Sequence, residues 1–147
     1  PVSRREFWKL LSQFLAQGIT IVMSTPYLDE AERCTRIVLL HEGQVLALDN
    51  PGALRAGLPG LLLEVLVAAP REALRRLRGP GGVTRAQVFG DRLHVWSDRV
   101  GEAEAVDAFR DIAARVGIVA TGIRVVVPSL EDVFIAKLDS SPETAVP

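Results

Sequence analysis

The sequence predicts an α/β protein made of two parts, with a small α+β unit in its second half. Residues 19–24 are apolar and rich in β-branched side chains without alternation, which is typical of a strand covered on both faces of a parallel sheet. Leu58, Pro59 and Gly60 then interrupt regular structure. After this break the pattern reads strand, helix, strand, strand, helix, strand, which predicts a four-stranded antiparallel sheet with two helices on one face.

Composition describes an ordinary globular chain and excludes several classes of protein. The chain has 147 residues, of which 48% are hydrophobic and 24% charged, enough for one domain or two small ones. Its 17 basic residues are nearly balanced by 18 acidic ones and are scattered, so we expect no nucleic-acid partner. The longest apolar stretch is too short to cross a bilayer and no signal peptide opens the chain, so we expect no direct membrane insertion.

Cysteine and histidine usage indicates neither a disulfide nor a metal site. Cys34 is the lone cysteine, which excludes an intramolecular disulfide and suits a reducing cytoplasm. His41 and His94 lie far apart, without a cysteine or carboxylate at ligand spacing. We therefore expect no metal ligands in this sequence.

A helix is predicted near the start of the chain, with Ser3 as its cap and Gly18 as its stop. Its apolar residues recur at helical spacing and form one stripe. The stripe consists of Phe7, Leu10, Leu11, Phe14 and Leu15. We expect this stripe to pack against a sheet.

A hairpin is predicted after a short helix over residues 27–34. Strands over 36–40 and 44–48 flank a turn that contains Gly43, a residue suited to such turns. The turn over residues 49–52 then leads into another short helix.

Residues 61–127 carry the elements of the α+β unit. The elements are a strand over 61–67, a helix over 70–77 begun by proline, strands over 83–89 and 92–96, a helix ending at Gly117 and a strand over 118–127. The inner stripe of the second helix comprises Val106, Phe109, Ile112, Ala113 and Val116. This βαββαβ order is that of the ferredoxin-like, or split βαβ, arrangement.

The last predicted helix begins with a capping box at residues 129–132, in which a serine hydroxyl and an acidic side chain satisfy free amides. Leu130, Phe134 and Leu138 share one face of this helix. The tail over residues 139–147 is small and polar, so we expect it to be mobile.

One loop resembles a specific part of a known family. Thr25-Pro26-Tyr27-Leu28-Asp29-Glu30-Ala31-Glu32, directly after the apolar run, resembles the switch-histidine loop of ABC transporter ATPase subunits. In that family the strand ends Ser-Thr-His, the histidine contacts the terminal phosphate of the nucleotide, and an acidic helix follows. Pro26 occupies the histidine position here, and proline has no side-chain donor. The residues alone also permit a local interpretation, with Thr25 as a helix cap and Pro26 in the first turn.

Three further segments carry the same resemblance. Residues 1–8 resemble the segment after the Walker B strand and D-loop, and residues 36–57 resemble the hairpin and turn that end an ABC nucleotide-binding domain. Ser129-Leu130-Glu131-Asp132-Val133-Phe134 resembles the closing motif of drug- and polysaccharide-exporter ATPases. The sequence has no Gly-x-x-x-x-Gly-Lys-Ser/Thr loop to cradle phosphates.

The resemblance implies the C-terminal fragment of a P-loop NTPase domain over residues 1–58, an accessory ferredoxin-like domain over 61–138 and a flexible tail over 139–147. The expected parent is the ATP-binding subunit of an ABC-2-type multidrug exporter, membrane-associated on the cytoplasmic face of the inner (plasma) membrane. It would use ATP and Mg, energise a membrane permease and pair with a second nucleotide-binding domain.

The nucleotide-contacting positions implied by the resemblance are Ser24, Thr25 and Pro26, and no catalytic residue is assigned. The site is expected to be impaired in hydrolysis, acting as a degenerate ATP site, and the fragment alone is expected to be inactive and to hold no cofactor.

Two alternatives belong to other classes. Residues 61–138 could form an independent regulatory or ligand-binding module. A stand-alone enzyme would use Asp91 and His94, or Asp29 and Glu30, as acid and base. Tyr27 and Trp8 are candidate contact residues, although aromatics beside apolar stripes usually belong to the core or its rim.

Overall fold

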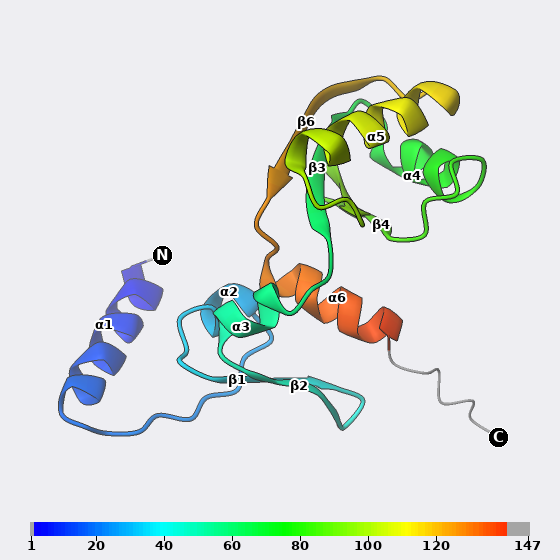
Figure 1. Cartoon of the computed structure of the whole chain (residues 1–147). Helices are drawn as coiled ribbons and strands as arrows, with labels where there is room; N and C mark the ends of the chain where they lie inside the picture. Colours follow the sequence, from blue (N-terminus) through cyan, green and yellow to red (C-terminus); the bar gives the residue numbers. More distant parts are fainter. Residues whose placement is uncertain (1, 141–147) are drawn as a thin grey trace.

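The computed structural model of the chain describes residues 2–140, a mixed α/β structure with two antiparallel sheets (Figure 1). The helices are α1 (Val2–Ala16), α2 (Leu28–Ala31), α3 (Pro51–Ala56), α4 (Pro70–Arg78), α5 (Glu102–Arg115) and α6 (Leu130–Ser140). The strands are β1 (Ile37–His41), β2 (Gln44–Asp49), β3 (Leu61–Val67), β4 (Ala86–Phe89), β5 (Arg92–Ser97) and β6 (Ala120–Val126). Within residues 2–140, no helix has the length and apolarity needed to cross a membrane.

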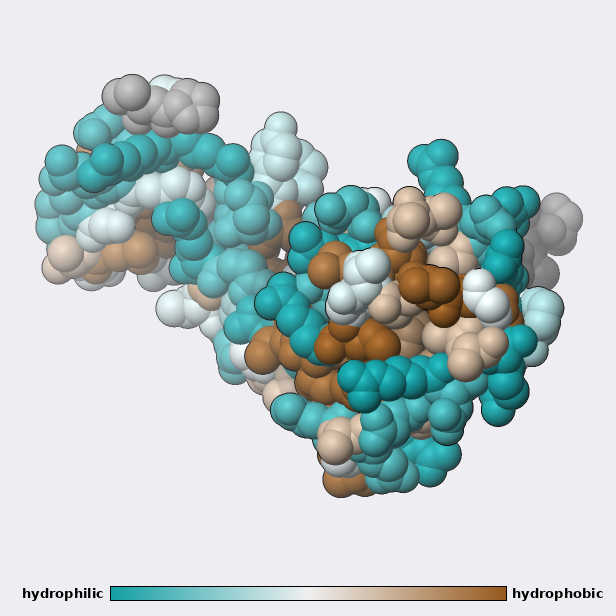
Figure 2. Space-filling view, turned by 90° about the horizontal axis from the view of Figure 1, so that it is seen from above, coloured by the Kyte–Doolittle hydropathy of each residue, from teal (hydrophilic) through white to brown (hydrophobic). Residues whose placement is uncertain are grey.

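Helix α1 stands at the edge of the molecule with its apolar stripe exposed. The helix starts before Ser3, so the predicted cap at that residue is wrong, whereas Gly18 follows it with a φ of +82° as expected for a helix stop. The exposed stripe consists of Phe7, Leu10, Phe14 and Leu15. Brown, hydrophobic surface is visible at the left of Figure 2, on the part of the molecule that carries α1. The expected packing of this stripe against a sheet is therefore absent from the described residues.

Residues 19–24 form no strand, so that prediction is wrong. The segment runs from α1 towards α2 without regular structure, and the side chain of Val22 is 93% exposed. A strand must satisfy its backbone N–H and C=O groups with a neighbour. Among the described residues, no strand pairs with this segment, so its apolar β-branched composition alone does not produce sheet.

The hairpin of β1 and β2 confirms the predicted turn. Glu42 and Gly43 form its two-residue loop with φ of 48° and 77°, the left-handed pair that matches the twist of the strands. The next helix, α3, is capped by Asn50, whose Oδ1 accepts the N–H of Ala53 at 2.8 Å, and it starts with Pro51.

Helix α6 packs onto this hairpin and its neighbouring helices, a group of elements that we call the hairpin module (α2, β1, β2, α3 and α6). The buried centre of the module is Ile37, Leu39, Leu130 and Val133. The predicted helix start after Ser129 is confirmed. The helix continues to Ser140, so the prediction of a tail is wrong at residues 139–140, and the remainder of that predicted tail lies outside the described residues. In Figure 1, α6 lies between the β1–β2 hairpin and the larger sheet.

The four-stranded unit comprises β3 to β6 with α4 and α5. Its strand order is β4-β5-β3-β6, all antiparallel, and its element order is the predicted strand, helix, strand, strand, helix, strand. Both helices cover the same face (Figure 1). The buried residues between them are Leu63, Val65, Ala73, Leu77, Ala86, Leu93, Val95, Ala105, Phe109 and Ala113. The unit begins and ends on neighbouring strands, with Leu62 opposite Val126.

The other face of this sheet carries a row of polar residues. Side chains alternate between the two faces of a strand, so the residues between the core positions of β3 and β5 point away from α4 and α5. Gln87, His94, Glu64 and Arg124 are register partners across the four strands. Glu64 and His94 are buried nonetheless.

Candidate functional site

The loop over residues 24–27 is held by hydrogen bonds to Thr25. The Thr25 hydroxyl donates to Glu30 Oε2 at 2.5 Å and accepts the N–H of Tyr27 at 3.1 Å. Tyr27 precedes α2 without a side-chain cap bond, so the local interpretation of Thr25 as the cap of this helix is wrong. Ser24 and Pro26 are exposed beside this bonded threonine.

Arg4 joins α1 to the acidic residues that follow the loop. Its Nε donates to Glu30 Oε1 at 2.8 Å and its Nη2 lies 3.3 Å from Asp29 Oδ2, while its guanidinium lies 5.2 Å from the centre of the Tyr27 ring. The hydrogen bonds from Thr25 and Arg4 hold the pKa of Glu30 below its ordinary value. The carboxylates of Asp29 and Glu30 therefore pair with the Arg4 guanidinium rather than forming an acid and base pair.

These residues do not fit a nucleotide by themselves. The Thr25 hydroxyl already donates its proton to Glu30, and Pro26 has neither a side-chain donor nor a backbone N–H. The Arg4 guanidinium is already paired with Asp29 and Glu30. Within residues 2–140 this loop therefore lacks a phosphate cradle.

A second polar cluster lies where the first turn of α6 meets the four-stranded sheet. Asp132 is 1% exposed, and its Oδ1 accepts hydrogen bonds from His94 Nδ1 at 2.7 Å and Gln87 Nε2 at 3.1 Å. Its Oδ2 accepts the N–H and the hydroxyl of Ser129 at 2.8 and 2.7 Å. The Asp132 N–H donates to Ser129 Oγ at 3.3 Å, which confirms the predicted capping box.

Glu64 and His94 continue this cluster into the sheet. Glu64 accepts hydrogen bonds from Arg92 Nη1 at 2.9 Å and Arg124 Nε at 2.7 Å, and one of its oxygens lies 3.9 Å from His94 Nε2. The Phe89 ring stacks on His94 with 4.3 Å between ring centres. Burial raises the pKa of Glu64, but the two arginines outweigh it and leave that pKa below its ordinary value.

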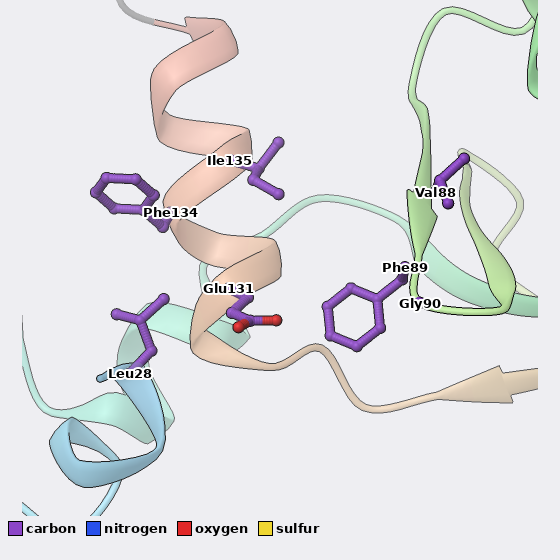
Figure 3. A pocket seen from close by; sticks show the side chains of 7 residues that line it. All are labelled: Leu28, Val88, Phe89, Gly90, Glu131, Phe134 and Ile135. Carbon is purple, nitrogen blue, oxygen red and sulfur yellow. The ribbon is translucent and has the colours of Figure 1, made fainter. Parts of the chain in front are cut away.

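An open groove separates α6 from the tip of the β4–β5 hairpin (Figure 3). In Figure 3, Glu131 and Ile135 of α6 point towards Phe89 across the gap. The groove has a volume of about 430 Å³, and its lining is apolar except for Glu131. The full lining is Leu28, Val88, Phe89, Gly90, Glu131, Phe134 and Ile135.

The structure does not assemble either acid and base pair of the enzyme alternative. Asp91 is exposed and bonded to Arg92 at 3.0 Å, whereas His94 is buried against Asp132. Asp29 and Glu30 share Arg4. Among the described residues, no group of three or more histidine, cysteine, aspartate or glutamate side chains could hold a metal ion.

The candidate contact residues Trp8 and Tyr27 lie where α1 meets the segment around α2. The Trp8 ring lies 5.1 Å from the guanidinium of Arg33, in the same way that Tyr27 lies against Arg4. Both rings are therefore cation–π partners.

Sequence reasoning missed Arg4, and it paired His94 with Asp91 rather than with Asp132. Arg4 lies 26 residues from Glu30 and His94 lies 38 residues from Asp132. The capping box drew attention to Asp132, but no local pattern identifies a distant partner.

The pKa of Asp132 predicts part of the acid sensitivity of the fold. Burial raises this pKa, and the hydrogen bonds from His94 and Ser129 outweigh burial and lower it below 3.8. The stabilisation is then complete above pH 3.8 and is lost as the pH falls through the lower folded-state value. In Asp132→Asn we expect the free energy of unfolding to fall less steeply as the pH decreases on the acid side (the acid limb). Urea titration at successive pH values measures this dependence.

The matched control for this experiment is Asp98→Asn, because the Asp98 side chain is 96% exposed. It should leave the acid limb unchanged. Equal acid limbs for Asp132→Asn and the unsubstituted protein would contradict a lowered pKa at Asp132.

Comparison with known proteins shows to which class of protein this chain is related. No family model matches the sequence. The chain is 33% identical over 142 residues to the daunorubicin resistance ATP-binding protein DrrA2 of Streptomyces coeruleorubidus, covering 92% of this chain and 43% of that protein. It is 32% identical over 139 residues to the Nod factor export ATP-binding protein I of Rhizobium sp. (strain N33), covering 92% of this chain and 42% of that protein.

A third relative matches the chain over a shorter length. The probable multidrug ABC transporter ATP-binding protein YbhF of Escherichia coli (strain K12) is 39% identical over 77 residues, which cover 52% of this chain and 13% of that protein. The chain thus spans less than half the length of these relatives.

The chain is a homologue of ABC transporter ATP-binding proteins. Its relatives are named for drug resistance, multidrug transport and Nod factor export, so the predicted resemblance to ATP-binding proteins of the drug-exporter type is confirmed.

Proposed function

We propose that the chain acts as the C-terminal part of the ATP-binding subunit of an ABC-2-type exporter. In this proposal, residues 1–58 end the nucleotide-binding domain and residues 61–138 form its accessory domain. The ferredoxin-like part of that domain is β3 to β6 with α4 and α5, while α6 returns to pack on the hairpin module. The observation that carries the proposal is the match of 92% of this chain to an ATP-binding protein of drug resistance. The strand order β4-β5-β3-β6 supports a ferredoxin-like arrangement.

Exposed apolar surface near the start of the chain supports the assignment of residues 1–58. Phe7, Leu10 and Leu15 of α1 are 45%, 48% and 57% exposed, and Val22 of the unpaired segment is 93% exposed. Contiguous apolar surface of this kind marks an interaction site. The rest of a nucleotide-binding domain would cover these exposed side chains.

The proposed subunit works with ATP and Mg, a membrane permease and a second nucleotide-binding domain at the cytoplasmic face of the membrane. Ser24, Thr25 and Pro26 would line the nucleotide site. Pro26 has no donor for a phosphate oxygen, so this site would hydrolyse ATP poorly while still contributing to nucleotide-dependent pairing. Phosphoryl transfer depends on positioning and on donors aimed at the phosphates, which is why this one position matters.

A hybrid protein tests the proposal. The segment of the Streptomyces daunorubicin resistance protein that matches this chain, 43% of its length, would be replaced by residues 1–147. We expect the hybrid to fold and to bind ATP with Mg, measured by equilibrium titration with a fluorescent ATP analogue. A folded hybrid that has lost ATP binding would overturn the assignment, with the unaltered relative as the reference.

The regulatory-module alternative predicts a different result. It expects this chain alone to bind an amino acid or a nucleotide tightly, which calorimetry on the 147-residue chain would detect. The exporter proposal expects no such binding.

A further inference from the structure

The first turn of α6 is bonded to two parts of the molecule at once. On one side, the N–H of Leu130 donates to Glu32 Oε1 at 3.3 Å, and the other oxygen of Glu32 pairs with Arg55 of α3. On the other side, Asp132 accepts hydrogen bonds from Gln87 and His94 of the four-stranded sheet. Two residues of a single helical turn therefore connect the hairpin module to the sheet.

On the side of the hairpin module, the connection reaches the loop at Pro26. Glu32 closes the one-turn helix α2, with its N–H bonded to Leu28 O at 3.1 Å. The same turn carries Glu30, which accepts the Thr25 hydroxyl at 2.5 Å. Because α2 is a single turn, a displacement of the loop moves Glu30 and Glu32 together.

On the side of the sheet, the connection enters the polar row on the outer face. His94 is fixed between Asp132, the Phe89 ring and Glu64, and Glu64 is held by arginines of β5 and β6. The carboxylates of Glu64 and Asp132 are buried and paired, so breaking one of their bonds leaves an unsatisfied buried charge at high cost. The row therefore moves with the sheet as one body.

Apolar packing does not fill the same boundary. Glu131 and Ile135 face Phe89 across the open groove of about 430 Å³ (Figure 3). The directional hydrogen bonds of Asp132 thus fix the position of α6 against the sheet, while the groove leaves space for the two to change their angle.

We propose that the first turn of α6 is a joint that couples the loop over residues 24–27 to the four-stranded unit. Glu32 and Asp132 are its positioning residues. If the loop lines the ATP site, as the proposed function has it, a bound nucleotide changes the affinity of the four-stranded unit for a partner through this joint. That partner changes the affinity for the nucleotide by the same factor.

The test uses the 147-residue chain and measures amide hydrogen exchange by NMR, without nucleotide. In Asp132→Asn we expect exchange at the Tyr27 and Ala31 amides to rise at least about fivefold, the lower end of typical coupling. In Glu32→Gln we expect a rise of similar size at the His94 amide in β5. The amides of Val65 and Leu93, in the core of the sheet, report global unfolding and should change less.

The matched control is Glu131→Gln, which removes the neighbouring exposed carboxylate and should leave Tyr27 and Ala31 unchanged. Gln87→Ala removes one hydrogen bond to Asp132 and should act in the same direction as Asp132→Asn, which covers the case that the latter fails to fold. The proposal is overturned if either effect stays local, or if the core amides rise by the same factor as the reporting ones. Loss of ATP binding in the hybrid with this coupling intact would remove the proposed function and leave the joint.

Discussion

Replacing Pro26 with histidine is expected to raise ATP turnover of the hybrid protein by about 10²–10³-fold, the range for restoring one well-placed donor. The imidazole can donate a hydrogen bond to a phosphate oxygen, whereas proline cannot. Pro26 is exposed beside Thr25, so the larger ring meets no packed core. The measurement is phosphate release at saturating ATP and Mg.

Pro26→Ala is the matched control for this substitution. Alanine removes the proline ring without adding a donor, so turnover should stay low. Unchanged turnover in Pro26→His would show that the side chain at this position is not limiting. An equal rise in both variants would assign the effect to backbone constraint rather than to hydrogen bonding.

Truncating Leu63 to alanine is expected to lower the free energy of unfolding by about 2–5 kcal/mol. Leu63 is 1% exposed in the inner strand β3 and packs in the core under α4 and α5. The lost methyl groups leave a cavity that surrounding side chains fill only in part. Urea unfolding followed by circular dichroism measures the change.

Leu66→Ala makes the same chemical change on the same strand. Leu66 is 38% exposed and points to the opposite face, so we expect a loss below about 1 kcal/mol. Similar losses for the two variants would contradict the assignment of the core to one face of β3.

Local sequence signals were sufficient to predict much of the fold. The loop of Glu42 and Gly43 and the capping box at Ser129 each depend on contacts within a few residues, so both could be predicted without knowing the remainder of the chain. The order of strands and helices in the four-stranded unit could be predicted for the same reason, because hydrophobic periodicity marks each element in turn.

The strand over residues 19–24 could not be settled by composition, because a strand exists only with a partner. The interpretation of the loop depended on that strand leading to Pro26, and the structure does not provide it. Similarity over 92% of the chain to ATP-binding proteins supports the family independently of this segment.

The candidate site was only partly predictable. The loop with Thr25 and Pro26 was found from its motif, but its bonding to Glu30 and Arg4 depends on how α1 folds back. The packing of α6 against the hairpin module likewise depends on which apolar face is available to Leu130 and Val133.

The four-stranded unit is connected to the hairpin module by two chain crossings, one before β3 and one after β6. The crossings are adjacent, since Leu62 and Val126 are register partners, and the chain then returns to the module as α6. The unit is therefore attached at one end only, and a change in its angle to the module would take place about this single attachment. The hydrogen bonds from His94 and Gln87 to Asp132 lie beside that attachment and limit such a change.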